Sequence, residues 1–137
     1  MVGIVVMTHG RLGEEMVRTV ESVIGRVAGI EAVSVDTDLE VVKAKLRRVI
    51  ERSDEGGGTL VLTDMLGDTA TNLALAVAGS LRVEVIAGAN MPMLLKAASA
   101  RGTMGLREFA AFIRQYGRDH IFWASEHGGS TDGTVRG

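Results

Sequence analysis

The sequence predicts an α/β fold: a doubly wound, mainly parallel four-stranded sheet in the order 2-1-3-4, with helices on both faces. Short apolar runs rich in β-branched residues alternate with stretches whose apolar residues recur at helical spacing, as in parallel sheets. Residues 2–7 are almost entirely apolar, as expected of a strand covered on both faces. The chain has 18 glycines but one proline, so glycine must supply most of the tight turns.

Each element has its own signal. After the strand at 2–7, apolar residues at helical spacing predict a helix over 12–24 that ends at Gly25. A second strand is expected at 30–35, and Asp38 is the expected N-cap of a helix that is broken by three glycines at 56–58. The remaining elements are a strand at 59–63, a helix at 70–79, a strand at 82–87, a helix beginning at Pro92, a helix from Leu106 to about Gly117, and a short last strand at 120–124.

Length and composition exclude several classes of protein. A chain of 137 residues suits one domain, predicted over residues 1–124, with a solvated tail at 125–137. The absence of cysteine removes disulfides and thiolate chemistry, and 15 basic against 17 acidic residues argue against a nucleic-acid binder. No apolar run reaches the ~18 residues of a membrane span, and no basic residue precedes the apolar N-terminus as in a signal peptide. We therefore expect a cytoplasmic protein.

The predicted topology also locates the binding site. In doubly wound sheets, ligands bind beyond the carboxyl ends of the strands, where the winding direction reverses. In the order 2-1-3-4, this switch point lies between strands 1 and 3. The loops at 8–11, 64–72 and 88–91 are therefore the candidate site.

The first of these loops contains His9, directly after the first strand. One interpretation is a polar residue that ends the strand. The other is a nucleophile or base, because imidazole titrates near neutral pH. His120 and His127 lie outside the three loops and are expected to be structural or solvated.

The second loop contains Asp64, Gly67, Asp68 and Thr69. Helix capping alone would explain some of these residues. If Asp64 instead accepts a hydrogen bond from one ring nitrogen of His9, it fixes the tautomer and activates the other nitrogen for attack on phosphorus. The hydroxyl of Thr69 would then hold phosphoryl oxygens at the start of the next helix, with Gly67 and Gly10 allowing close approach of the backbone.

The third loop and nearby apolar residues complete the predicted site. Asn90 and Met91 follow the fourth strand, and Met65 follows the third. Methionine suits surfaces that accept several partners, so these residues are expected to form a site wall or a partner-binding surface, although methionine can also be core filler. No phosphate-binding Walker loop is present, and no metal or cofactor is expected.

At these residues the sequence resembles the mannose-family enzyme IIA component of the phosphoenolpyruvate-dependent sugar phosphotransferase system. Three motifs carry the resemblance: Gly3-Ile-Val-Val-Met-Thr-His-Gly10, Leu62-Thr-Asp-Met-Leu-Gly-Asp-Thr-Ala-Thr-Asn72 and Glu84-Val-Ile-Ala-Gly-Ala-Asn-Met-Pro-Met-Leu95. His9 stands at the family's phosphorylated position, and Asp64 matches the carboxylate that partners it.

The resemblance implies a homodimer in which the last strand, here 120–124, crosses to the partner's sheet as an antiparallel strand. It also implies that the protein accepts a phosphoryl group from the phosphocarrier HPr. The group then passes to a IIB component for sugar uptake and phosphorylation, so that contact with the membrane is only indirect, through the IIC and IID transporter.

The second motif departs from the family's usual Gly-Gly-Ser-Pro-Phe-Asn. Asp68 replaces a glycine, while Ala70 and Thr71 replace a proline and an aromatic residue. Two other functions therefore remain open: a regulatory module of the same system without a transport role, and the phosphoryl-donor subunit of a dihydroxyacetone kinase. A response-regulator receiver is disfavoured, because no acidic residue follows the first strand.

Overall fold

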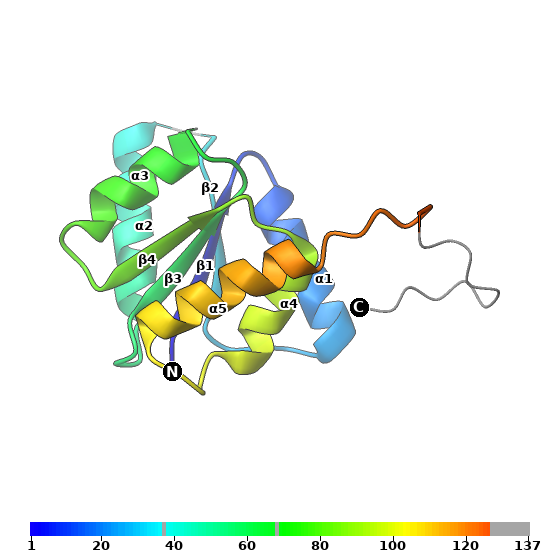
Figure 1. Cartoon of the computed structure of the whole chain (residues 1–137). Helices are drawn as coiled ribbons and strands as arrows, with labels where there is room; N and C mark the ends of the chain where they lie inside the picture. Colours follow the sequence, from blue (N-terminus) through cyan, green and yellow to red (C-terminus); the bar gives the residue numbers. More distant parts are fainter. Residues whose placement is uncertain (37, 68, 127–137) are drawn as a thin grey trace.

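Four parallel strands form the central sheet of the computed structural model, which describes residues 1–36, 38–67 and 69–126 (Figure 1). The strands are β1 (Gly3–Thr8), β2 (Ile30–Ser34), β3 (Thr59–Thr63) and β4 (Val83–Ala87). Their order is β2-β1-β3-β4, and every neighbouring pair is parallel. The predicted sheet and its 2-1-3-4 order are confirmed.

Helices cover both faces of this sheet (Figure 1). In the described residues they are α1 (Leu12–Ile24), α2 (Leu39–Ser53), α3 (Thr69–Ala78), α4 (Met91–Ala100) and α5 (Leu106–Asp119). Helices α1, α4 and α5 pack on one face, and α2 and α3 on the other. The fold is therefore doubly wound, as the sequence predicts.

The alternation of side chains along β1 explains why that strand is apolar on both faces. Ile4 and Val6 point into the core under α1, α4 and α5, whereas Val5 and Met7 point into the core under α2 and α3. All four side chains are fully buried. Because β1 and β3 lie in the middle of the sheet, the loops that follow them are held by rigid, buried strands.

The helix ends follow their expected signals. Gly25 ends α1 with a positive φ of 87°, and the carboxylate of Asp38 accepts the amide N–H groups of Glu40 and Val41 at the start of α2. Pro92 lies in the first turn of α4, where its missing N–H costs nothing.

The C-terminal part begins with the last helix, which ends close to its expected position. Helix α5 continues to Asp119, two residues beyond Gly117, and Gly117 packs against α4, where a Cβ atom would lie only 2.4 Å from the Cε of Met93. Residues 120–124 form no strand in the described chain. A strand needs a hydrogen-bonded neighbour, and this segment extends away from the body of the fold (Figure 1).

The predicted tail at 125–137 lies mostly outside the described residues. Within the part of the chain that the structure describes, no helix is long and apolar enough to cross a membrane.

Candidate active site

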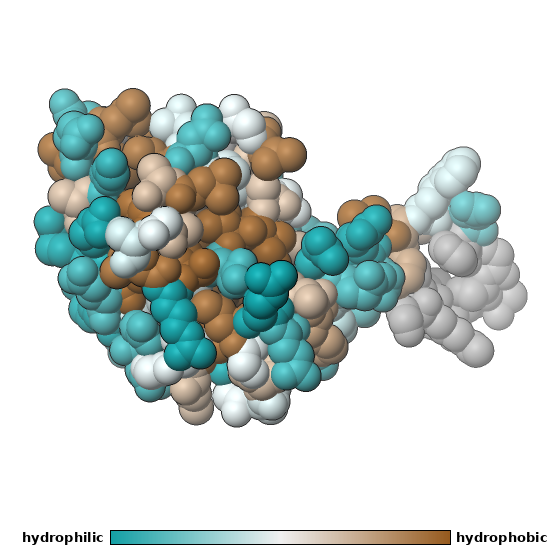
Figure 2. Space-filling view, turned by 60° about the vertical axis from the view of Figure 1, so that its left-hand side comes forward, coloured by the Kyte–Doolittle hydropathy of each residue, from teal (hydrophilic) through white to brown (hydrophobic). Residues whose placement is uncertain are grey.

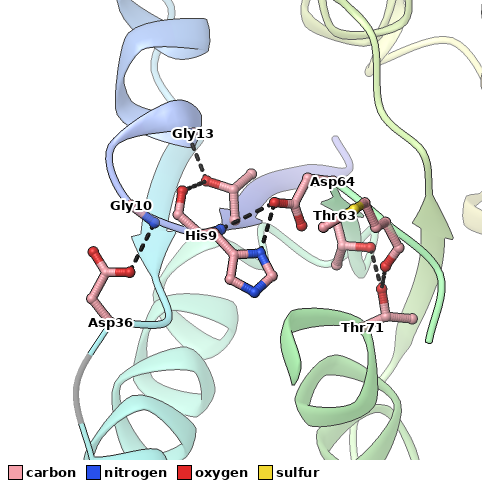
Figure 3. Close-up of polar contacts among 9 residues, drawn as sticks. His9, Gly10, Gly13, Asp36, Thr63, Asp64 and Thr71 are labelled. Carbon is pink, nitrogen blue, oxygen red and sulfur yellow. Dashed lines mark hydrogen bonds and ion pairs between the residues drawn. The ribbon is translucent and has the colours of Figure 1, made fainter. Parts of the chain in front are cut away.

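The carboxyl ends of β1, β2 and β3 bring one histidine and two aspartates together (Figure 3). His9 follows β1, Asp64 follows β3, and Asp36 lies two residues after the end of β2. The sequence predicts that His9 meets Asp64, since parallel strands end at the same edge of the sheet. That Asp36 joins them is new in the structure.

His9 and Asp64 form a hydrogen-bonded pair. Oδ2 of Asp64 lies 3.0 Å from Nδ1 of His9, and the same oxygen accepts the amide N–H of His9 at 3.2 Å. The Asp64 side chain is 10% exposed, whereas that of His9 is 48% exposed. A carboxylate can only accept at neutral pH, so this geometry assigns the proton of the neutral ring to Nδ1 and leaves the lone pair on Nε2. Figure 3 shows Nε2 pointing away from Asp64.

Thr8 fixes the turn that carries His9. Its buried hydroxyl oxygen accepts the amide N–H of Gly13 at 2.7 Å, and the hydroxyl donates to the His9 carbonyl oxygen at 3.1 Å. Helix α1 approaches β1 closely here, because the position of a Cβ on Gly13 would lie 3.1 Å from both Thr8 Oγ1 and Val6 O. The His9 backbone is therefore tied to the start of α1.

Asp36 holds the next residue of the same turn. Its Oδ1 accepts the amide N–H of Gly10 at 2.8 Å, and Gly10 has a positive φ of 53°. The Gly10 amide and then the Ser34 hydroxyl lower the pKa of the Asp36 carboxyl; burial opposes them, and the nearby His9 ring contributes a weaker lowering. Asp36 is therefore ionised at neutral pH. The sequence alone did not indicate this residue, because it follows β2, whose end is not among the three loops expected to form the site.

Buried hydroxyl groups support the loop that follows β3. Oγ1 of Thr63 lies 2.6 Å from Oγ1 of Thr71, and the Thr71 hydroxyl donates to the carbonyl oxygen of Met65. Both threonines are almost completely buried. Thr71 therefore joins the end of β3 to the first turn of α3, and it shapes the loop that begins with Asp64.

The other predicted site residues lie around this centre. Gly67 has a positive φ of 82°, and Thr69 is exposed at the first residue of α3. Met65 is exposed at the same edge of the sheet, next to Leu66, which is 82% exposed. Asp68 lies outside the described residues.

Asn90 and Met91 have structural contacts at the start of α4. The Asn90 side chain accepts the amide N–H of Met93 at 3.0 Å and donates to the Gly117 carbonyl at 3.0 Å, so it caps α4 and joins it to α5. Met91 packs against the core. The backbone of the same loop is anchored to β3, because the amides of Gly88 and Ala89 both donate to Thr63 O.

His120 lies at the end of α5. Its Nδ1 is 2.8 Å from the carbonyl oxygen of Tyr116, and its ring stacks on the Tyr116 ring with 3.8 Å between centroids. These contacts are structural. His127 lies outside the described residues. Among residues 1–36, 38–67 and 69–126, no three side chains of His, Asp or Glu are placed to hold a metal ion.

Comparisons with known proteins agree with this architecture. A family model described as "PTS system fructose IIA component" (EIIA-man) matches residues 3–114. The chain is 31% identical over 128 residues to the "PTS system mannose-specific EIIAB component" of Escherichia coli (strain K12). That alignment covers 88% of this chain but only 38% of the relative, so the chain spans less than two-fifths of the relative's length.

Solved structures share the fold. The mannose/sorbose-specific IIA subunit from Enterococcus faecalis superposes with a TM-score of 0.77 at 29% identity, covering 88% of this chain and 92% of that one. The phosphotransferase system component EIIA from Streptococcus agalactiae superposes with a TM-score of 0.84, covering 92% and 99% of the two chains, although only 21% of residues are identical. With a family model that matches residues 3–114 and a relative above 30% identity, the chain belongs to the mannose-type EIIA family of phosphotransferase system components.

Proposed function

We propose that this protein is a phosphohistidine carrier, which accepts a phosphoryl group from HPr on Nε2 of His9 and passes it to a IIB component for sugar uptake and phosphorylation. The observation that carries the proposal is the His9–Asp64 pair, in which the buried carboxylate holds Nδ1 while the His9 side chain remains 48% exposed. The printed names of the relatives, which describe mannose-specific and mannose/sorbose-specific components, support it. This role places the protein in the cytoplasm.

In the proposed transfer, the lone pair of Nε2 attacks the phosphorus atom of phosphorylated HPr. The new P–Nε2 bond forms as the bond from phosphorus to the donor nitrogen breaks, and the donor histidine leaves with the electron pair. The His9 ring, which keeps its proton on Nδ1, becomes positively charged. Asp64 stabilises this charge through the 3.0 Å contact to Nδ1. Attack by a IIB nucleophile on the same phosphorus then breaks the P–Nε2 bond.

The oxygens of the phosphoryl group need hydrogen-bond donors. We assign this role to the Thr69 hydroxyl, with Gly67 allowing close approach, because the free amides at the start of α3 favour anions. Gly10 was also expected to contribute, but its amide donates to Asp36 in this structure, so it would bind phosphate only after that bond opens. Exposed Met65 supplies apolar surface for the partner, and we assign Asn90 and Met91, at the start of α4, to the same surface.

Phosphorylation with phosphoenolpyruvate, enzyme I and HPr tests the proposal. We expect one phosphoryl group per chain, stable in base and labile in acid, as for a phosphoramidate. His9→Ala should abolish the label, and the matched control His120→Ala should retain it. Label that persists in His9→Ala, or that is lost in His120→Ala alone, would refute the assignment. Addition of IIB proteins from mannose-type systems then tests onward transfer.

We also propose that the protein is a homodimer in which residues 120–124 pair with the open edge of β4 in a second copy. Among the described strands, β4 pairs only with β3, and its residues are half-buried. A shallow groove follows this edge, lined by Leu66, Glu84, Ile86, Arg107, Ala110 and Arg114. Figure 2 turns this side of the molecule forward, and apolar side chains gather in the middle of the face.

The segment after α5 has the side-chain pattern of a strand. Ile121 and Trp123 are 73% and 71% exposed, whereas the Phe122 ring between them packs edge-on against His120. Such alternation suits a strand that buries one face against a partner. The family resemblance implies the same arrangement.

A further inference from the structure

Two carboxylates hold the turn that carries His9, one from each side (Figure 3). The amide of His9 donates to Asp64, which follows β3, and the amide of Gly10 donates to Asp36, which follows β2. Strand β1 lies between β2 and β3, so the two carboxylates reach the turn from opposite sides. The bond from Gly10 is the shorter of the two backbone contacts, 2.8 Å against 3.2 Å.

The peptide group between His9 and Gly10 depends on this second contact. Its carbonyl oxygen accepts the Thr8 hydroxyl at 3.1 Å and the Leu12 amide at 3.4 Å, which is a long bond. Its N–H is held by Asp36. Gly10 sits in the left-handed region, and glycine has the widest backbone freedom of any residue. Asp36 therefore holds the N–H side of this peptide plane, while Thr8 and Leu12 hold its carbonyl side.

We propose that Asp36 is a positioning residue, an inference that rests on the proposed transfer at His9. Its carboxylate oxygen holds the Gly10 amide, and this contact keeps the His9 ring oriented with Nδ1 toward Asp64 and Nε2 outward. The hydrogen-bond acceptor is what matters for this role. The negative charge acts in the opposite direction, because it lies near the site where a doubly charged phosphoryl group arrives.

Two substitutions separate the acceptor from the charge. Asp36→Asn keeps a side-chain oxygen that can accept the Gly10 N–H but removes the charge, whereas Asp36→Ala removes both. A matched control is Asp54→Ala, because Asp54 also accepts glycine amides, from Gly56 at 2.8 Å and Gly58 at 3.0 Å, but does so at the opposite, amino edge of the sheet.

The first measurement is the initial rate of phosphorylation by phosphorylated HPr. We expect Asp36→Ala to lose about 10-fold, less than the ~100-fold that a displacement of 1 Å can cost. Asp36→Asn should retain most of the rate or exceed it, and Asp54→Ala should match the unmodified protein. If Asp36→Asn loses as much as Asp36→Ala, the charge is what matters and the proposal is wrong.

The second measurement needs no phosphorylation, and so it separates this inference from the proposed function. Nitrogen-15 NMR of the His9 ring reports the fraction of the tautomer with the proton on Nδ1. That fraction should stay high in Asp36→Asn and Asp54→Ala and fall in Asp36→Ala. If the tautomer fraction of His9 is unchanged in Asp36→Ala, the inference is wrong, whatever the rate of phosphorylation. If the unmodified protein accepts no phosphoryl group while Asp36→Ala disturbs the ring, the proposed function fails and the positioning role stands.

Discussion

One oxygen atom of Asp64 accepts hydrogen bonds from both the amide and the ring of His9, so a single carboxylate sets the backbone and the side chain of the proposed nucleophile. Asp36 adds the neighbouring amide. Its lowered pKa means that it stabilises the fold above the ~3.9 of an unfolded aspartate, and that this stabilisation is lost as the pH falls through the lower folded value. Between pH 5 and 8 this contribution is constant.

The two carboxylates of the 64–72 loop are expected to have unequal effects. Asp64→Asn keeps the shape but removes the charge that stabilises the ring, and an amide turned toward Nδ1 would select the wrong tautomer. The same type of change costs about 10⁴-fold in a serine protease triad. We expect about 10²-fold here, because a phosphohistidine donor needs less basicity in the acceptor than an acyl substrate does. The initial rate of transfer from HPr measures it.

The comparison variant is Asp68→Gly, which restores the residue usual in the resembling family. This change removes a negative charge from the motif, so the rate of transfer should be unchanged or faster. If the carboxylate stabilises the start of α3 through the helix dipole, the free energy of unfolding should fall slightly, by ~0.3–1 kcal/mol. A slow Asp68→Gly beside a normal Asp64→Asn would show that the roles of the two carboxylates are reversed.

At the scale of elements, the spacing of apolar residues predicted the four strands and the helices between them, because buried side chains recur at different intervals in strands and in helices. The predicted ends of α1 and the N-cap of α2 also hold, since Gly25 and Asp38 act locally. Helix α5 ends two residues after Gly117, and the sequence alone does not show that Gly117 packs closely against Met93. Asp36 was missed because it follows β2, whose carboxyl end was not among the three loops expected to form the site.

The contact between Thr63 and Thr71 is the element-scale feature that we expect to dominate the stability of the site. Thr71→Val keeps the shape but leaves the Met65 carbonyl and the Thr63 hydroxyl without this partner. Loss of a buried partner costs about 1–3 kcal/mol, and urea unfolding should report that decrease in the free energy of unfolding. The control Thr19→Val removes an exposed hydroxyl that bonds Glu15 O, and it should change stability by no more than about 0.5 kcal/mol. Equal effects of the two variants would contradict this account.

At the scale of the whole molecule, the two edges of the sheet differ. Strand β2 lies at one edge beside a groove whose charged groups include an ion pair between Arg52 and Glu31 at 2.8 Å. The β4 edge is less charged: Glu84 is the one charged residue among the five half-buried residues of the strand, and exposed Leu66 lies nearby, although Arg107 and Arg114 line the same groove. Charged edges resist strand addition, whereas apolar edges invite it. The β4 edge is therefore the one that we expect a second copy to cover.

The dimer can be tested with substitutions that leave the folded body intact. Ile121→Ser combined with Trp123→Ser removes two exposed apolar side chains that lie outside both cores of the chain, so the variant should fold normally but dissociate. Val23→Ser is the matched control, because Val23 is 63% exposed on α1, which packs beside β2 and β1 rather than β4. Sedimentation at micromolar concentration should give a dimer for the unmodified protein and for Val23→Ser, and mainly monomer for the double variant. The proposed strand exchange would be excluded if the unmodified protein sediments as a monomer. It would also be excluded if the double variant dimerises as tightly as the unmodified protein, because these two residues supply most of the apolar area that the segment can bury.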